Sequence, residues 1–222
     1  MMAKKVGVVL SGCGVFDGSE IHEAVLTLLA LDRQGVEILC MAPNIDQLHV
    51  VNHLTKQPTD EVRNVLVESA RIARGDIEDV KTAHAADIDA LMFPGGFGAA
   101  KNLCNYATKS TDCDVHPEVE RLVHEMLSAK KPVAAVCIAP ALLAKITGKQ
   151  GIRAKLTIGT DQGTAKDLET MGADHVACQV REVAVDKEHK IVTGPAYMLG
   201  TNISEVADGI ENVVKELVAL ID

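Results

Sequence analysis

Short apolar runs alternate along this chain with longer segments in which apolar residues recur at helical spacing. Residues 6–10 form an apolar run that ends at a glycine turn, and residues 36–42 form a second run. Between them, residues 19–33 carry apolar side chains at i, i+3, i+4, i+7 and i+8, which predicts a helix that Gly35 stops. The predicted buried face of this helix comprises Ile21, Ala24, Val25, Leu28 and Leu29. This order predicts two parallel strands joined by a right-handed crossover.

The same alternation continues to the end of the chain. Further strands are expected over residues 88–93, 132–136 and 155–158, with a hairpin that pairs 183–185 with 191–192. Helices are expected over residues 60–74 (between Thr59 and Gly75), 117–131 and 164–171, and after the capping pair Asn202 and Glu205. The stretch from 43 to 80 is otherwise less regular. We therefore predict an α/β fold, a three-layer sandwich with a mainly parallel sheet, formed by a single domain over residues 1–222.

The composition narrows the range of partners. Of the 222 residues, 47% are hydrophobic, which is enough for one substantial core. The net charge of −9, the absence of a basic block and an aromatic content of 2% argue against nucleic acid and anionic membrane surfaces. No run approaches the ~18 apolar residues that span a bilayer, and the first apolar run is too short for a secretion signal. We expect a cytoplasmic protein with no nucleic-acid partner and no membrane partner.

Candidate chemistry lies at one edge of the predicted sheet, because parallel α/β sheets bind ligands outside the carboxyl ends of their strands. Residues 11–17, residues 94–98 and Cys137 all follow such ends. Cys137 stands where the run 132–136 gives way to a helical segment, and a thiol at a helix N-terminus is drawn toward the thiolate. We predict that Cys137 is a nucleophile. An inert buried cysteine is the alternative, and Cys13 in the first loop is the rival thiol.

Two further groups could complete this site. Gly95 and Gly96 directly follow their strand, and their backbone N–H groups, with that of Ile138, could form an oxyanion hole. An ordinary tight turn is the alternative interpretation. Glu23, one position off the apolar stripe of the first helix, could reach the edge of the sheet and carry protons. The alternative is a surface carboxylate that complements the helix dipole, as Glu20 also could.

No cofactor and no metal is predicted. Gly12, Gly14 and Gly18 imitate a dinucleotide fingerprint, but the last spacing is one residue too long and the second strand ends without an acid. Cys113 and His116 have the spacing of a metal-ligand pair, yet no second pair completes a site, which favours a surface loop. The six cysteines include no C-x-x-C pair, so we expect reduced thiols.

Several of these features resemble one superfamily. The loop PGGFG at residues 94–98, the strand–Cys137–helix junction and a glutamate on the first helix resemble the class I glutamine amidotransferase-like superfamily, which includes the PfpI-type proteins. Within it, LSGCGVFDGSEIHEA at residues 10–24, AAKNL at 99–103 and VCIAPA at 136–141 resemble the ElbB branch. That branch is described as a glyoxalase and as an isoprenoid biosynthesis protein with an amidotransferase-like domain. The resemblance covers essentially the whole chain and implies the flavodoxin-like fold of this superfamily.

The resemblance also implies roles and a reaction. It makes Cys137 the nucleophile and Glu23 the glutamate that contacts the thiol. It implies conversion of glyoxal, a small dicarbonyl substrate, to glycolate without glutathione, and a homodimer. Ile138 departs from the PfpI-type peptidases, which often have a histidine there, and residues 156–161 lack the histidine common after the elbow helix. The tripeptide at 116–118 is the His-Pro-Glu of the glutaminase members, but here it precedes the nucleophile.

These departures weaken peptidase and glutaminase chemistry. The leading hypothesis is a slow, cysteine-dependent glyoxalase of the lyase type. One alternative is a non-enzymatic redox-sensing or regulatory protein linked to isoprenoid biosynthesis, because a thiolate is also easily oxidised. A degenerate amidase is another.

Overall fold

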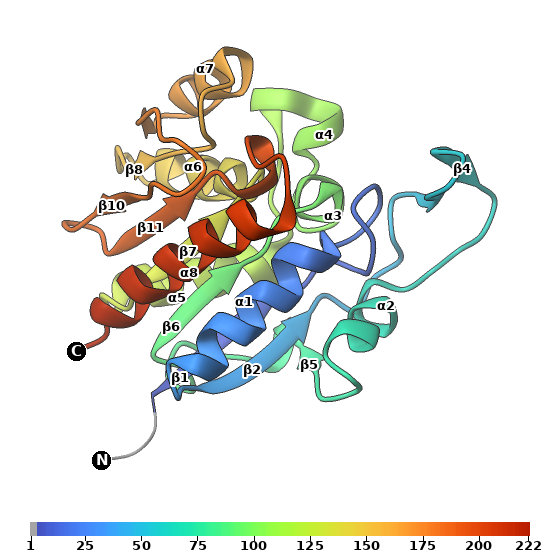
Figure 1. Ribbon diagram of the computed structural model, residues 1–222, viewed down its shortest axis with the longest axis horizontal. Helices are drawn as coiled ribbons and strands as arrows, with labels where there is room; N and C mark the ends of the chain where they lie inside the picture. Colours follow the sequence, from blue (N-terminus) through green and yellow to red (C-terminus); the bar gives the residue numbers. More distant parts are fainter. Residues whose placement is uncertain (1–3) are drawn as a thin grey trace.

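In the computed structural model, which describes residues 4–222, one seven-stranded sheet lies between two layers of helices (Figure 1). The strand order is β10-β11-β7-β6-β1-β2-β5, and every neighbouring pair is parallel except β10 and β11. The strands are β1 (Lys5–Val9), β2 (Glu37–Ala42), β5 (Glu78–Asp79), β6 (Ala90–Phe93), β7 (Val133–Val136), β10 (Ala184–Asp186) and β11 (Ile191–Gly194). The predicted parallel sheet and the predicted hairpin are confirmed. Residues 1–3 of the predicted domain lie outside the described residues.

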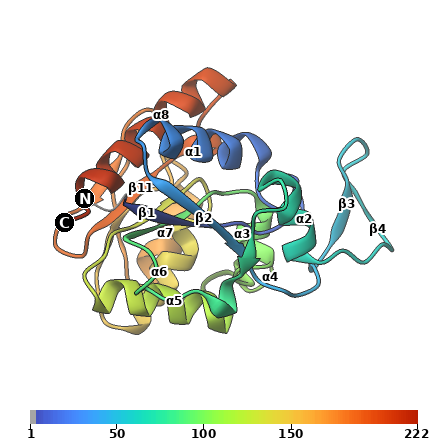
Figure 2. The same ribbon diagram turned by 90° about the horizontal axis from the view of Figure 1, so that it is seen from below.

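Helices cover both faces of this sheet (Figure 2). One layer holds α1 (Ile21–Arg33) and α8 (Ile203–Ala219), and the other holds α5 (Pro117–Ser128) and α6 (Pro140–Lys149). The start of α8 is as predicted, because the Asn202 side chain accepts a hydrogen bond from the Glu205 N–H. Across residues 4–222, no helix combines the length and the apolar sequence needed to cross a membrane.

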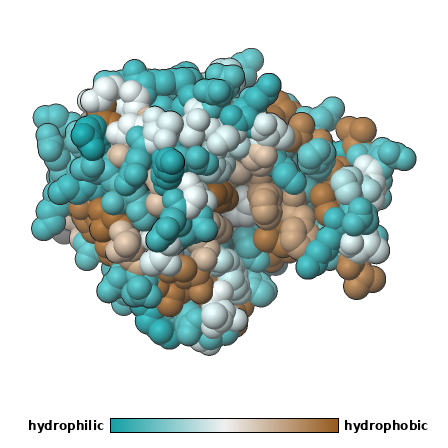
Figure 3. All heavy atoms as spheres, turned by 90° about the horizontal axis from the view of Figure 1, so that it is seen from above, coloured by the Kyte–Doolittle hydropathy of each residue, from teal (hydrophilic) through white to brown (hydrophobic). Residues whose placement is uncertain are grey.

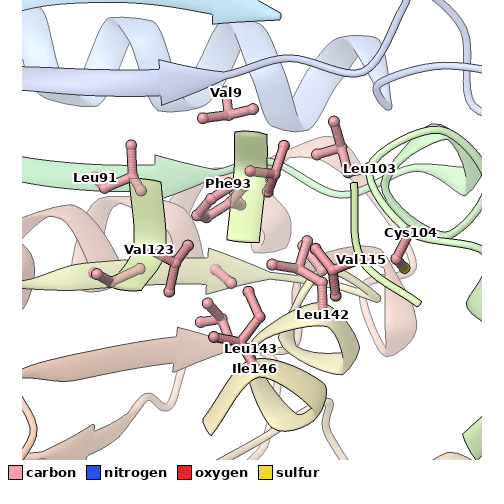
Figure 4. Close-up of a cluster of buried hydrophobic side chains, with 14 of the residues drawn as sticks. Val9, Leu91, Phe93, Leu103, Cys104, Val115, Val123, Leu142, Leu143 and Ile146 are labelled. Atoms are coloured by element: carbon pink, nitrogen blue, oxygen red, sulfur yellow. The ribbon is translucent and has the colours of Figure 1, made fainter. Parts of the chain in front are cut away.

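Each central strand is buried on both faces, which explains its continuous apolar sequence. Along β6, Leu91 and Phe93 pack toward α5 and α6, whereas Ala90 and Met92 pack toward α1 and α8. Figure 4 shows the first of these clusters, in which Phe93 and its neighbours meet side chains of α5 and α6. The sheet therefore has a rigid centre, and the loops that follow its strands start from fixed positions.

The buried face of α1 differs from the predicted one. Its buried side chains are Glu23, Ala24, Thr27, Ala30 and Leu31. Of the predicted stripe, Ile21, Val25 and Leu29 are 40–47% exposed. Apolar residues occupy two adjacent stripes of this helix, so their spacing could identify the helix but not the side that faces the sheet. Apolar side chains also reach the surface elsewhere, in patches separated by hydrophilic ones (Figure 3).

The stretch from 43 to 80 is only partly as predicted. Its helix, α2 (Val65–Ile72), starts five residues later than expected, because the side chain of Asn64 rather than Thr59 caps it. Before it, β3 (Val50–Asn52) and β4 (Gln57–Thr59) form a hairpin that projects from the body and was not predicted (Figure 1).

The remaining elements are short. The expected strand at 155–158 is shorter, and as β8 it pairs with β9 in a separate two-stranded sheet. The expected helix at 164–171 is α7, shifted by two residues at its start. These elements are β8 (Lys155–Leu156), β9 (Asp174–His175), α3 (Phe97–Lys101), α4 (Tyr106–Lys109), α7 (Gln162–Thr170) and the 3-10 turns η1 (Val80–Thr82), η2 (Ser110–Asp112) and η3 (Ala196–Met198).

Candidate active site

Four strand ends meet at one edge of the sheet. Because β1, β6, β7 and β11 are mutually parallel, the segments after them emerge side by side. Three of these segments were expected there: the loop after β1, the glycine loop after β6 and the junction after β7. The fourth, η3 after β11, was missed, although Gly194-Pro195 is the same kind of strand-end signal as Pro94-Gly95.

Cys137 occupies a strained turn between β7 and α6. Its φ is +60°, in the left-handed region that non-glycine residues rarely adopt. The backbone N–H of Cys137 donates to the Gly194 carbonyl of the neighbouring strand at 3.0 Å, which holds the turn in place. Cys137 is 8% exposed, and α6 begins only at Pro140. The strand–cysteine–helix junction thus exists, with the thiol three residues before the first helical residue.

Glu23 lies beneath this thiol and is fully buried. Its Oε2 accepts a hydrogen bond from the Gly95 N–H, and its Oε1 accepts one from the Tyr197 N–H, both at 3.0 Å. A Cβ built on Gly95 would lie 2.4 Å from the Cys137 Cβ and 2.5 Å from the Glu23 Oε2. The absence of a side chain at Gly95 therefore lets the carboxylate and the thiol lie against the same stretch of backbone.

Two backbone N–H groups lie close to the Cys137 sulfur. The N–H groups of Gly96 and Ile138 lie beside Cys137 and lower the pKa of its thiol, while within residues 4–222 neither donates to a protein oxygen. Gly95 behaves differently from our expectation, because its N–H is already committed to Glu23. Of the three amides expected to form an oxyanion hole, Gly96 and Ile138 are the two available.

Burial dominates the protonation of this pair. It raises the pKa of Glu23 from 4.5 to about 7, with a further contribution from the Glu20 carboxylate. Burial and the charge of Glu23 also raise the pKa of the Cys137 thiol well above its usual value, although the two amides act in the opposite direction. The expected thiolate is therefore wrong for the resting state. Cys137 rests as a neutral thiol beside a carboxylate that can take its proton near neutral pH.

A cavity of about 280 Å³ opens above the sulfur. Glu20 is the one charged residue in its lining, and most of the remaining walls are apolar. The lining residues are Val15, Glu20, Gly96, Phe97, Cys137, Ile138, Tyr197 and Met198. The cavity is large enough for a small organic molecule and brings it directly against the thiol.

Other candidates from the sequence do not reach this site. Cys13 lies in the loop after β1, yet it is absent from the cavity lining. His116 lines a different cavity with Asp79 and Lys81. Cys113 is fully buried, with its Sγ 3.9 Å from the Met171 Sδ, so the expected surface loop is wrong there.

All six cysteines are free. Across residues 4–222, no group of three or more His, Cys, Asp or Glu side chains is arranged to hold a metal ion.

Comparison with known proteins points to one family. Residues 13–198 match the model of the DJ-1/PfpI family. The human glutamine amidotransferase-like class 1 domain-containing protein 3, named as mitochondrial, is 46% identical over 98% of this chain and 84% of its own length. The expected cytoplasmic location stays a prediction.

Solved structures give the same result. An isoprenoid biosynthesis protein with an amidotransferase-like domain from Ehrlichia chaffeensis is 40% identical, with a TM-score of 0.90 over 97% of this chain and 99% of the other. Glyoxalase III from Candida albicans is 15% identical, with a TM-score of 0.64 over 99% and 98% of the two chains, and shares the fold.

A methyl group at Gly95 should disrupt the site. We expect Gly95→Ala to lower the free energy of unfolding by about 1–3 kcal/mol. The added Cβ would overlap the Cys137 Cβ, and that atom cannot move aside because it is bonded directly to the backbone. Gly163→Ala is the matched control, because its nearest neighbour would lie at 3.5 Å. Thermal and urea unfolding of both variants measure the effect, and equal stability of the two would contradict the packing described.

Removing the charge of Glu23 should make Cys137 more acidic. Since the carboxylate raises the pKa of the thiol, we expect Glu23→Gln to move the pH midpoint of Cys137 alkylation by iodoacetamide to lower pH. Mass spectrometry of the peptide containing Cys137 measures the rate. Glu188→Gln, which removes an exposed carboxylate on the β10–β11 turn, should leave the midpoint unchanged. A midpoint that is the same in Glu23→Gln and wild type would show that the two groups are not coupled.

Glu23 should also make stability depend on pH. The pKa of Glu23 is higher in the folded protein than in the unfolded chain. The stabilisation that comes from this difference is therefore fully present below the unfolded pKa and is lost as the pH rises through about 7. We expect the free energy of unfolding of wild type, relative to Glu23→Gln, to fall by roughly 3 kcal/mol from about pH 4 to about pH 8. Urea unfolding of both proteins across this range measures the difference in free energy of unfolding. A difference that does not change with pH would mean that Glu23 is exposed to solvent.

Proposed function

The chain belongs to the DJ-1/PfpI family, and within that family we propose that it is a glutathione-independent glyoxalase that converts glyoxal to glycolate through Cys137. The observation that carries this proposal is the buried pair of Cys137 and Glu23 below a small cavity, with two unoccupied amides beside the sulfur. A carboxylate with a pKa of about 7 can act as the base for the thiol, so the site works without a histidine.

The reaction begins with addition of sulfur to one aldehyde. Glu23 accepts the thiol proton while the Cys137 sulfur bonds to the carbonyl carbon, and the electrons of the C=O bond move to its oxygen. The N–H groups of Gly96 and Ile138 stabilise this oxyanion. Glu23 then returns the proton to the oxygen, which leaves a hemithioacetal and restores the carboxylate.

The second stage moves hydrogen between the two carbons. Glu23 removes the hydrogen of the sulfur-bearing carbon as a proton and delivers it to the neighbouring carbon through an enediol. The hydroxyl oxygen of the hemithioacetal loses its proton and the oxygen of the second carbonyl gains one. The product is therefore the thioester of glycolate. The oxidation of one carbon balances the reduction of the other, and no external oxidant is needed. Water then cleaves the thioester and releases glycolate and the Cys137 thiol.

The resting state of the thiol disfavours the redox-sensing alternative. Oxidation follows thiolate character and exposure, and Cys137 is a buried thiol whose pKa is raised. The amidase alternative is weakened because Ile138 stands where the PfpI-type peptidases often have a histidine. Glyoxal requires no leaving group in its first stage, which suits a site in which Glu23 is the base at the sulfur.

The activity test compares nucleophile, base and control. We expect wild type to form glycolate from glyoxal without glutathione, and Cys137→Ser to form none because the thiol supplies the covalent bond. Glu23→Gln should lower the rate by about 10²–10⁴-fold, the usual worth of a general base. Cys13→Ser, a change of the rival thiol outside the cavity, should retain the wild-type rate. Equal glycolate formation by wild type and Cys137→Ser would refute the proposal.

A further inference from the structure

The proposed reaction needs two proton-transfer groups at different atoms. Glu23 serves the sulfur and the hydrogen that moves between the carbons. Both of its oxygens are already held, by the N–H groups of Gly95 and Tyr197, so the carboxylate is fixed below the sulfur. The oxygen of the second carbonyl must gain a proton when the enediol forms, and the proposed reaction therefore also needs a proton donor for this oxygen.

Tyr197 is the residue of the cavity lining that carries a hydroxyl. Its backbone N–H donates to Glu23, which fixes the residue beside the Cys137–Glu23 pair. It belongs to η3, directly after β11, where the buried residue Ala196 has a φ of +43° and the Met198 N–H donates to the Pro195 carbonyl. The position of the ring therefore depends on a tight turn that is anchored to the sheet and to the carboxylate.

Among residues 4–222, the side-chain partner of the Tyr197 hydroxyl is His22. The Tyr197 Oη lies 2.7 Å from the His22 Nδ1, and the ring centroids lie 5.8 Å apart. His22 precedes Glu23 on α1, so one turn of this helix supplies both the base at the sulfur and the partner of the tyrosine. Burial and the carboxylates of Glu20 and Glu23 raise the pKa of Tyr197, which keeps its hydroxyl protonated and able to donate.

We propose that Tyr197 is a second acid–base residue of this site and that His22 is its positioning residue. This inference rests on the proposed glyoxalase function. As Glu23 removes the proton from the sulfur-bearing carbon, the Tyr197 O–H protonates the oxygen of the second carbonyl, and the electrons of the broken C–H bond form the C=C bond of the enediol. When the enediol collapses to the thioester, the first oxygen returns its proton to Tyr197. The exposed imidazole of His22 orients the hydroxyl throughout.

The side chain and the backbone of Tyr197 can be tested separately. Tyr197→Phe removes the hydroxyl and keeps the N–H that holds Glu23, so the pair at the sulfur should be unaffected. Tyr106→Phe is the matched control, because the other tyrosine of the chain donates its hydroxyl to Asp167 at 2.7 Å outside the cavity. His22→Ala removes the partner, and His22→Gln retains an oxygen that can accept the hydrogen bond.

The experiment measures glycolate formation together with alkylation of Cys137. We expect Tyr197→Phe to lower kcat by about 10²-fold with little change in KM, the usual worth of a general acid. Glyoxal should still protect Cys137 from iodoacetamide in this variant, because the hemithioacetal forms before the tyrosine acts. His22→Ala should lower kcat by less, His22→Gln should recover part of the loss, and the double variant Tyr197→Phe/His22→Ala should be no slower than Tyr197→Phe alone. Tyr106→Phe should match wild type.

The outcomes separate this inference from the function on which it rests. If wild type forms glycolate and Tyr197→Phe forms it equally fast, the tyrosine has no part in catalysis and the inference is wrong. If Tyr197→Phe loses both glycolate formation and protection of Cys137 by glyoxal, the hydroxyl only supports the Cys137–Glu23 pair, and the inference is again wrong. If wild type itself forms no glycolate, the proposed function and the inference fall together.

Discussion

The buried carboxylate of Glu23 is the interaction that joins the parts of this site. It comes from α1, it accepts hydrogen bonds from the loop after β6 and from the turn after β11, and it lies against the thiol that follows β7. These segments are distant in sequence and meet only because their strands are neighbours in a parallel sheet. A buried carboxylate without donors is strongly unfavourable, so the correct placement of Gly95 and Tyr197 is a condition for the stability of the site.

The features on which the proposed reactivity depends also oppose stability. Burial raises the pKa of Glu23 to about 7, which costs folding free energy at neutral pH and in return provides a base whose pKa matches that pH. Cys137 adopts a left-handed backbone conformation, and Gly95 can carry no side chain without contacting the thiol. The two fully buried central strands, β6 and β7, hold these unfavourable features in place.

The proposed chemistry uses no histidine next to Cys137. A helix N-terminus alone would favour the thiolate, but α6 starts three residues after Cys137, and burial and Glu23 have the larger effect. The thiol therefore depends on proton transfer at the moment of reaction instead of resting as an anion. Fold membership does not determine this property, because it results from the particular residues around one sulfur atom.

Much of the architecture could be predicted from the sequence, because apolar periodicity and strand-end glycines are local signals. They indicated the parallel sheet, the Cys137 junction and the glycine loop, and the offset of Glu23 from the apolar stripe indicated that it could turn inward. Periodicity placed the buried side of α1 wrongly, since Ile21, Val25 and Leu29 face outward. The late start of α2 and the β3–β4 hairpin were missed because their caps and turns have weak signals.

What the sequence determined by itself was the order of the elements and the candidates for chemistry. The tertiary structure alone decided which amides remain available, since Gly95 is committed to Glu23 whereas Gly96 and Ile138 face the sulfur. It also decided the protonation of the thiol, placed Tyr197 in the cavity lining and brought His22 against the Tyr197 hydroxyl. The physical reason is that burial, electrostatic coupling and hydrogen bonding depend on distances between residues that are far apart in the chain, and only the packed sheet sets those distances.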